Sequence, residues 1–345
     1  MRALTISAHG GLDCLELRDD LPAPAIVHDT DVLVRVRAAA INHLDLFVVE
    51  GLPGIIIRPP WIVGSDGTGT VEQVGGAVAS VSVGDTVVLN PGLSDRTCEY
   101  CLDGEQPLCP KFGVLGEHHP GTIAERIVVP EVNVGRVPAD VDPIEAAAMP
   151  LATLTAWRMI VTRARVQAGE HVLVWGIGGG VAIACLQICK LLGAHVTVTS
   201  GSDAKLERAR ALGADDTINH RGVDVGREIR ARTAKRGVDV VVDSVGEATW
   251  SQSLGALGRR GRLVTCGGTS GPMVTTDVRR LFWNQWSILG STMGSETEFS
   301  AIVQQFAAGR LRPPIDSVHE LADARAAYER LASGEQFGKV VIRIA

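Results

Sequence analysis

The segment from Val172 to Ala182 constrains the fold of this chain more than any other. It reads Val-Leu-Val-Trp-Gly-Ile-Gly-Gly-Gly-Val-Ala, an apolar run followed by a glycine-rich turn and an apolar helix start. Glycines let the backbone approach a pyrophosphate, and a helix N-terminus offers free N–H groups and a positive dipole end. The segment therefore predicts a dinucleotide-binding turn, the alternative being a glycine-rich turn that binds nothing. The expected contacts are Gly176, Gly178, Gly179, Gly180 and Val181.

Strands and helices alternate after residue 170. We expect strands at 171–175, 195–199, 238–242 and 261–266, and helices at about 180–192 and 203–212. This alternation predicts a parallel sheet with crossover helices. A further helix is expected to start at Pro143, with Asp142 as its N-cap.

The first third of the chain has the short-period pattern of a β domain. Residues 31–37 alternate apolar and polar side chains, and 69–75 and 84–89 are short apolar runs bounded by glycine. The tail, 338–344, reads as one more strand that we expect to rejoin this first domain. A chain of 345 residues is long for one domain, so two domains are expected.

The end of the expected strand 195–199 bears on the choice of cofactor. An acidic residue there would hold the ribose 2′-hydroxyl of NAD, but the chain has Thr199 and Ser200. Ser200, Ser202 and Lys205 can donate hydrogen bonds and charge to a 2′-phosphate, which favours NADPH over NADH. The alternative is that the hydroxyls cap the next helix and that Lys205 is a solvated surface residue.

Three cysteines and an aspartate lie close together in a turn-rich segment. Asp95, Cys98, Cys101 and Cys109 have spacings that can close a tetrahedral zinc site. Four protein ligands leave no open position, so we expect one structural zinc per chain, with Asp95 the weakest of the four ligands. Three free thiols in a metal-free loop are the alternative.

Composition excludes several classes of protein. The net charge is −6 and there is no basic run, so no nucleic-acid surface is expected. No apolar stretch is long and uninterrupted enough to span a bilayer, and the N-terminus carries no apolar signal core. The odd number of cysteines, seven, suits a reducing compartment. We therefore expect a cytoplasmic protein acting on a small molecule.

In combination, several motifs resemble those of the medium-chain dehydrogenase/reductase superfamily, which includes zinc alcohol dehydrogenases and quinone reductases. Besides the glycine turn and the cysteine segment, the motifs are Asn42–Asp45, Gly64–Gly69, Leu212–Asp215 and Gly338–Val341. The resemblance covers essentially the whole chain. It implies an α/β protein with a GroES-like β-barrel domain (1–130 and 299–345), a Rossmann doubly wound parallel-sheet domain (131–298), and an active site in the cleft between them.

The chain departs from the zinc alcohol dehydrogenases of this superfamily at the catalytic metal. Those enzymes bind it through a Cys, a His-Glu pair and a further Cys or acid. The matching places here hold Asn42, Ser65 with Asp66, and Leu151, and Asn, Ser and Leu are poor zinc ligands. The hydroxyl of the family's proton relay falls on Leu44. The resemblance therefore implies that the catalytic zinc is lost, as in the quinone-reductase branch with its Asn-x-x-Asp motif.

The resemblance also implies roles for individual residues. His43 would contact the cofactor pyrophosphate, and Thr155 would lie beside the nicotinamide. We expect Asn42 to hydrogen-bond the substrate oxygen or the nicotinamide, and Asp45 to hold the loop through backbone N–H groups. Ser65 is expected in the catalytic pocket, with His118 and Met293 as further lining residues. The alternative for Asp45 and Thr155 is a purely structural capping role.

These features lead to one expected function and two alternatives. The expected function is hydride transfer between NADP(H) and a quinone or an α,β-unsaturated carbonyl or aldehyde without catalytic zinc, in a homodimer. The first alternative is an alcohol dehydrogenase whose catalytic metal is rebuilt from other residues. The residues available for that are His43, Asp66, Glu117, His118 and His119. The second is an NADPH-binding protein without enzymatic activity.

Overall fold

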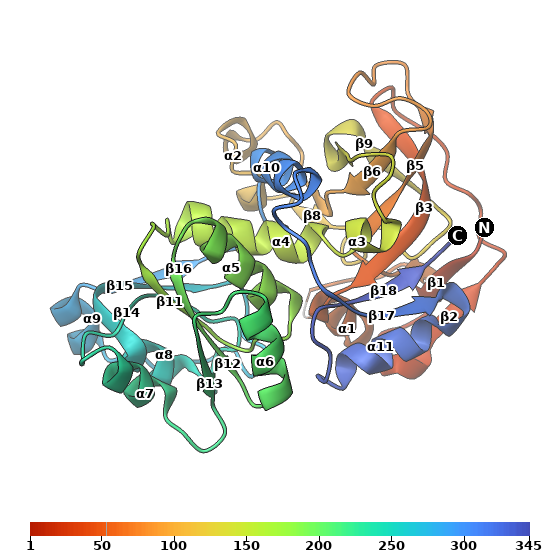
Figure 1. Cartoon of the computed structure of the whole chain (residues 1–345). Coiled ribbons are helices and arrows are strands. Elements are labelled where there is room, and N and C mark those ends of the chain that lie inside the picture. The colour runs from red at the N-terminus through yellow and green to blue at the C-terminus, as the bar shows by residue number, and fades with distance from the viewer. Residues whose placement is uncertain (53) are drawn as a thin grey trace. The chain divides into compact units, whose positions relative to one another are not determined.

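A computed structural model describes residues 1–52 and 54–345 of the chain and divides it into two compact units (Figure 1). The β unit comprises Met1–Leu154 and Gly294–Ala345, and the α/β unit comprises Thr155–Met293. In the described part of the chain, no helix has the length and apolar character needed to cross a membrane.

The β unit is built on a seven-stranded sheet whose strand order is β10-β6-β5-β3-β18-β17, with β9 also pairing with β3. Its strands are β3 (Asp31–Ile41), β5 (Asp66–Val74), β6 (Thr86–Leu89), β9 (Arg126–Pro130), β10 (Val134–Arg136), β17 (Ile315–Glu320) and β18 (Lys339–Arg343). The last strand pairs antiparallel with β3, in the register Val340 to Ile41. The expected return of the tail to the first domain is therefore confirmed.

Two smaller sheets complete the β unit, β2-β1-β4 and β7-β8. Their strands are β1 (Ala3–Ile6), β2 (Leu15–Arg18), β4 (Trp61–Ile62), β7 (Gly92–Leu93) and β8 (Gly113–Val114). The main core of the unit packs aliphatic side chains of β1, β3, β5 and β6 against helix α11 (Ala324–Ala332) and β18, with Tyr328 fully buried among them.

The helices of the β unit lie in the first half of the chain and near its end. They are α1 (His43–Glu50), α2 (Glu99–Leu102), α3 (Pro143–Ala147), α4 (Pro150–Trp157, which continues into the α/β unit), α10 (Glu296–Ala307) and α11 (Ala324–Ala332). Helix α3 starts at Pro143 with the Asp142 carboxylate accepting the Ile144 N–H at 2.9 Å, as expected. It packs against alanines of β3 and against Val341. Because of this packing, the first unit extends to Leu154 rather than to residue 130.

The α/β unit contains a six-stranded, all-parallel sheet with the order β13-β12-β11-β14-β15-β16. Its strands are β11 (His171–Val174), β12 (His195–Ser200), β13 (Asp216–Asn219), β14 (Val238–Val242), β15 (Leu257–Thr265) and β16 (Ser287–Gly290). Its helices are α5 (Gly180–Leu191), α6 (Asp203–Ala211), α7 (Val225–Arg232), α8 (Trp250–Ala256) and α9 (Val278–Asn284). The predicted parallel sheet with crossover helices is confirmed.

The strand order reverses direction at β11, which lies between β12 and β14. In open parallel sheets such a reversal leaves a crevice outside the carboxyl ends of the strands, where ligands bind. The glycine turn follows the carboxyl end of β11 and leads into α5. The topology therefore places this turn at the switch point of the sheet.

Candidate functional site

The glycine turn between β11 and α5 has the backbone geometry of an anion-binding loop. Gly176 and Gly178 have φ angles of 69° and 135°, in the region where side chains are disfavoured. Helix α5 begins at Gly180 with Gly179 as its N-cap, and no side chain caps it. A Cβ atom added at Gly179 would meet no other atom within 4 Å. The N-cap of this twelve-residue helix therefore has room beside it and no side chain capping its first N–H groups, as phosphate binding requires.

Hydroxyl groups gather at the carboxyl end of the neighbouring strand β12. The Gly176 N–H donates to Thr199 Oγ1 at 3.3 Å, which ties the glycine turn to this strand. Ser200 Oγ accepts the Ser202 N–H at 3.1 Å, and Ser202 is the N-cap of α6, accepting the Lys205 N–H at 3.4 Å. Ser202 thus caps α6 as the alternative interpretation expects, and Ser200 binds the backbone of that capping residue. Each hydroxyl keeps its own hydrogen as a donor.

Sequence reasoning missed one cation at this strand end. Arg221 follows β13 and is exposed, and a Cβ atom at Gly201 would lie 3.0 Å from its Nε. The Arg221 N–H donates to Asn219 Oδ1 at 3.0 Å, which fixes the turn that carries it. Because β12 and β13 pair in register from Thr197–Asp216 to Ser200–Asn219, this guanidinium lies beside the serines.

A buried polar cluster occupies the β unit where α1, β5 and β18 meet. Lys339 Nζ donates to Asp66 Oδ2 at 2.9 Å and to Asn42 Oδ1 at 2.5 Å. Asn42 Nδ2 donates to the same Asp66 oxygen at 2.9 Å, and the Leu151 N–H donates to Asp66 Oδ1 at 2.7 Å. Asp66 is therefore an acceptor for three donors that come from three separate segments of the chain.

Asp45 extends this cluster at the first turn of α1. Its carboxylate accepts the Asn42 N–H at 2.7 Å and the Ser65 hydroxyl at 3.2 Å, so it fixes the Asn42 loop through a backbone N–H. Burial raises the pKa of Asp45 to about 7, the Asn42 N–H opposes that rise, and the negative charge of Asp66 adds to it. Tyr328 Oη is buried near Asp45, and no atom in the described part of the chain is its hydrogen-bond partner.

The remaining predicted site residues lie in both units. In the β unit, His43 is the first residue of α1 and its exposed ring contacts Phe47 edge to face, with ring centroids 6.3 Å apart. Val114 N–H donates to His118 Nδ1 at 3.3 Å. In the α/β unit, the Thr155 hydroxyl donates to Met293 Sδ at 3.8 Å, and both residues are buried.

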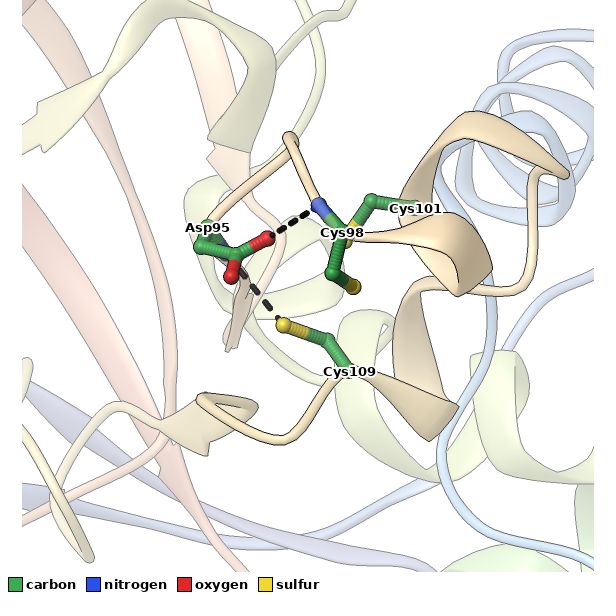
Figure 2. A group of neighbouring side chains, drawn as sticks. All are labelled: Asp95, Cys98, Cys101 and Cys109. Carbon is green, nitrogen blue, oxygen red and sulfur yellow. Dashed lines mark hydrogen bonds between the residues drawn. The ribbon is translucent and has the colours of Figure 1, made fainter.

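The four residues of the cysteine segment converge. One ligand atom from each of Asp95, Cys98, Cys101 and Cys109 lies within 4.8 Å of the others. Figure 2 shows the Asp95 carboxylate and the sulfurs of Cys98 and Cys109 pointing toward a common space. Asp95 Oδ1 accepts the N–H groups of Thr97 and Cys98, each at 3.0 Å. These backbone donors hold the pKa of Asp95 well below its usual range, so its carboxylate is charged.

The donor set of this cysteine lobe (Asp95, Cys98, Cys101 and Cys109) fits a zinc ion. Three thiolates and one carboxylate are ligands that zinc accepts, and a site with four protein ligands is structural. Backbone N–H groups of Asp95 and Lys111 donate to Cys109 Sγ at 3.5 and 3.4 Å. Such contacts orient and stabilise a thiolate.

Comparison with known proteins supports the expected family. Residues 28–139 match the family described as alcohol dehydrogenase GroES-like domain, and residues 180–308 match zinc-binding dehydrogenase. The zinc-type alcohol dehydrogenase-like protein YogA of Leptosphaeria maculans is 32% identical over 94% of this chain and 92% of that protein. The chain belongs to the medium-chain dehydrogenase/reductase superfamily.

Other relatives within this superfamily carry different activities in their names. Quinone oxidoreductase of Homo sapiens is 28% identical over 99% of this chain and 97% of that protein. A crystal structure named NAD-dependent alcohol dehydrogenase is 42% identical, with a TM-score of 0.96 and full coverage of both chains. The resemblance seen in the sequence is therefore confirmed, as is the fold of a GroES-like unit with a Rossmann-like unit, and the protein is an oxidoreductase of this superfamily.

Proposed function

We propose that this protein is an NADPH-dependent reductase that transfers hydride to a quinone or an α,β-unsaturated carbonyl compound without a catalytic zinc. The observation that carries the proposal is the buried cluster of Asn42, Asp66 and Lys339 in the β unit. By the sequence resemblance, the places of the catalytic zinc ligands in zinc alcohol dehydrogenases hold Asn42, Ser65 with Asp66, and Leu151 in this chain.

The hydrogen bonds of this cluster disfavour metal binding. The Lys339 ammonium, 2.9 Å from Asp66 and 2.5 Å from Asn42 Oδ1, already neutralises the carboxylate. The other oxygen of Asp66 accepts the Leu151 N–H, and the Ser65 hydroxyl donates to Asp45. A cation placed here would have to displace a buried ammonium, and the charge repulsion between the two would be large.

An acceptor that is already electrophilic suits such a site. Oxidation of an alcohol needs help to remove the hydroxyl proton, which a Lewis acid commonly provides. A quinone or an enone needs only a hydride and a proton, because its conjugation spreads the incoming charge. The nicotinamide supplies the hydride, and the protein supplies binding and orientation. Asn42 has a second side-chain N–H for the substrate oxygen or the nicotinamide amide.

The surroundings of Asn42 support a positioning role for its neighbours. Asp45 holds the start of α1 by accepting the Asn42 N–H. Ser65, the residue that precedes β5, donates its hydroxyl to the Asp45 carboxylate and so orients it. Lys339 and Asp66 fix the Asn42 amide from the other side. Under the proposal, Thr155 lies beside the nicotinamide and His43 contacts the pyrophosphate.

NADPH is the preferred cofactor in this proposal because cationic and hydroxyl donors surround the end of β12. Thr199 and Ser200 replace the acidic residue that binds the 2′-hydroxyl of NAD. Arg221 adds a guanidinium beside Gly201, and guanidinium groups match phosphate geometry. Lys205, in the first turn of α6, adds a second positive charge. Besides NADPH, the proposal includes one structural zinc ion per chain, bound by the cysteine lobe.

We further propose that the protein is a homodimer formed through the edge of the α/β sheet. Strand β16 is the last strand of that sheet. Phe282 and Trp283 on the adjacent helix α9 are 63% and 76% exposed, and Ile288 on β16 is 38% exposed. An open strand edge beside exposed aromatic side chains is a typical site of association between copies of a chain.

An alcohol dehydrogenase that uses NAD is the second candidate, favoured by the name of the 42% identical structure. Steady-state kinetics distinguish the two. Initial rates are measured with NADPH and NADH against a quinone, an enone and a saturated aldehyde, and with NADP⁺ and NAD⁺ against primary alcohols. The proposal predicts the highest kcat/KM for NADPH with the quinone or the enone. Efficient alcohol oxidation with NAD⁺ and slow enone reduction would support the second candidate instead.

A further inference from the structure

A second group of metal-binding side chains lies in the α/β unit, at the edge of the sheet opposite the glycine turn. His171, His195 and Asp216 are the first residues of β11, β12 and β13. These three strands are neighbours in the parallel sheet, and His171 pairs directly with His195. The amino ends of adjacent parallel strands meet at one edge, so the three side chains emerge side by side.

The ligand atoms of these residues are already close. One atom from each of the three lies within 4.8 Å of the others. The two imidazole rings have centroids 4.0 Å apart and are nearly perpendicular, at 80°. His195 Nε2 lies 2.7 Å from Asp216 Oδ2. In a tetrahedral zinc site with bonds of about 2.0–2.2 Å, ligand atoms are roughly 3.4 Å apart, so small side-chain rotations on a fixed strand frame suffice.

The hydrogen bonds of the cluster are incomplete without a ligand. His171 Nε2 is buried and has no hydrogen-bond partner among the residues that the structure describes, and an unpaired buried polar nitrogen costs free energy. A neutral imidazole nitrogen with a free lone pair is the form that binds metals.

The charged groups around the cluster do not fill its centre. Arg236 Nη2 donates to Asp239 Oδ1 at 2.5 Å, and the other oxygen of Asp239 accepts the His171 backbone N–H. Arg232 reaches Asp216 only at 3.9 Å, through the oxygen that does not face His195. The His195 and Asp216 side chains are 43% and 41% exposed, so an ion can enter from solvent.

We propose that His171, His195 and Asp216 form a binding site for zinc or a neighbouring divalent transition-metal ion. Two imidazoles and one carboxylate are a ligand set used by such ions, with water completing the coordination. Binding replaces the proton between His195 and Asp216 and gives His171 Nε2 a partner. Strand β11 has four residues, which separates this site from the glycine turn by about 13 Å. The ion would tie three strands together rather than take part in hydride transfer.

The test is metal titration of the whole protein with its cysteine-lobe zinc in place. Equilibrium dialysis against Co²⁺ and Zn²⁺ is expected to show one further ion per chain. Bound Co²⁺ should lack the thiolate charge-transfer absorption that it would show in the cysteine lobe. His171→Ala and Asp216→Asn should each weaken this second site by about 100-fold or more, whereas His28→Ala, which changes an exposed histidine of the β unit, should leave it unchanged.

Thermal unfolding provides a second readout that does not depend on activity. Ligands that bind only the folded state raise Tm, so added Zn²⁺ should raise the Tm of the wild type and of His28→Ala but not of Asp216→Asn. Asp216→Asn keeps the size of the side chain, and its Tm without added metal shows whether it folds. Failure to bind a second ion at saturating Zn²⁺ and Co²⁺ would overturn the proposal. So would a second ion bound equally well by both cluster variants.

Discussion

Lys339 Nζ lies 2.9 Å from Asp66 Oδ2, and the two side chains are 3% and 0% exposed to solvent. A fully buried ammonium and a fully buried carboxylate each lose hydration, and only their mutual attraction and further hydrogen bonds offset that loss. The Leu151 N–H and the Asn42 amide supply those bonds. This pair therefore determines how Asn42 is held.

Removal of the ammonium alone should be strongly destabilising. Lys339→Met leaves the Asp66 charge buried without its partner, and we expect the free energy of unfolding to fall by about 3–5 kcal/mol. In the double variant Lys339→Met with Asp66→Asn, much of this loss should be recovered, because no charge remains to be paired. Urea unfolding measures both. The control is Arg2→Met, which removes a partly exposed pair with Glu125 and should cost no more than about 1 kcal/mol.

The raised pKa of Asp45 makes stability depend on pH in an unusual direction for a carboxyl group. Its pKa is 3.8 in a free side chain and about 7 in the folded protein. Between these values the folded state holds a proton that the unfolded state has lost, so this group's contribution to stability falls as pH rises. The difference amounts to at most about 4 kcal/mol.

Asp45→Asn removes this contribution and keeps an acceptor for the Asn42 N–H. The free energy of unfolding of the wild type minus that of the variant should therefore decrease from pH 4 to pH 7 and level off above pH 8. Urea unfolding of both proteins across this pH range measures the difference. The titration of all other groups cancels, because these groups are the same in the two proteins. A difference that stays constant from pH 4 to pH 8 would show that Asp45 is ionised throughout.

Arg221 should discriminate between the two nicotinamide dinucleotides. Its guanidinium lies beside Gly201 at the end of β12, and a hydrogen bond to a charged group contributes about 1.5–3 kcal/mol. Arg221→Ala should raise KM for NADPH by about 10-fold or more and leave KM for NADH within about twofold. Arg227→Ala is the matched control, because Arg227 is also an exposed arginine of this unit. An equal change for both cofactors would rule out contact with the 2′-phosphate.

The exposed aromatic residues of α9 predict that a charge introduced on this helix prevents formation of the proposed homodimer. Trp283 is 76% exposed within one chain, and in the proposed dimer it is covered by the second copy. Trp283→Asp should convert the protein to a monomer in light scattering, whereas Val27→Asp, at a 78% exposed position of the β unit, should not. A wild-type protein that is monomeric at micromolar concentration would contradict the proposed homodimer.

Local sequence signals predicted most of the α/β unit. The strand, glycine turn and helix are adjacent in the chain, and α5 begins at Gly180 as expected. Strand β14 has its expected bounds, 238–242. Strand β15 begins at Leu257 rather than at the expected residue 261. The prediction started too late because Arg259 and Arg260 interrupt the apolar pattern at the beginning of the strand. Pattern reasoning finds the centre of a strand more easily than its ends.

The buried cluster was much harder to predict. Lys339 and Asp66 are 273 residues apart, and only the pairing of β18 with β3 brings the lysine to the cluster. A lysine in a strand is normally expected at the surface, and no neighbouring residue in the sequence indicates that Lys339 is buried. The His171, His195 and Asp216 group was missed for the same reason, since the register of three strands creates it. The cysteine lobe was predictable because its ligands are close in sequence.

The central claim, reduction without a catalytic metal, is tested most directly by the metal dependence of enone reduction. The protein is dialysed against a chelator until one zinc per chain remains, and kcat/KM is measured with NADPH and an enone before and after dialysis and after zinc is restored. The His171→Ala protein is measured in parallel, so that an ion at the edge of the sheet cannot be mistaken for a catalytic one. We predict that kcat/KM stays within about twofold throughout. A kcat/KM that falls as metal is removed and returns with added zinc, in both proteins, would contradict the account.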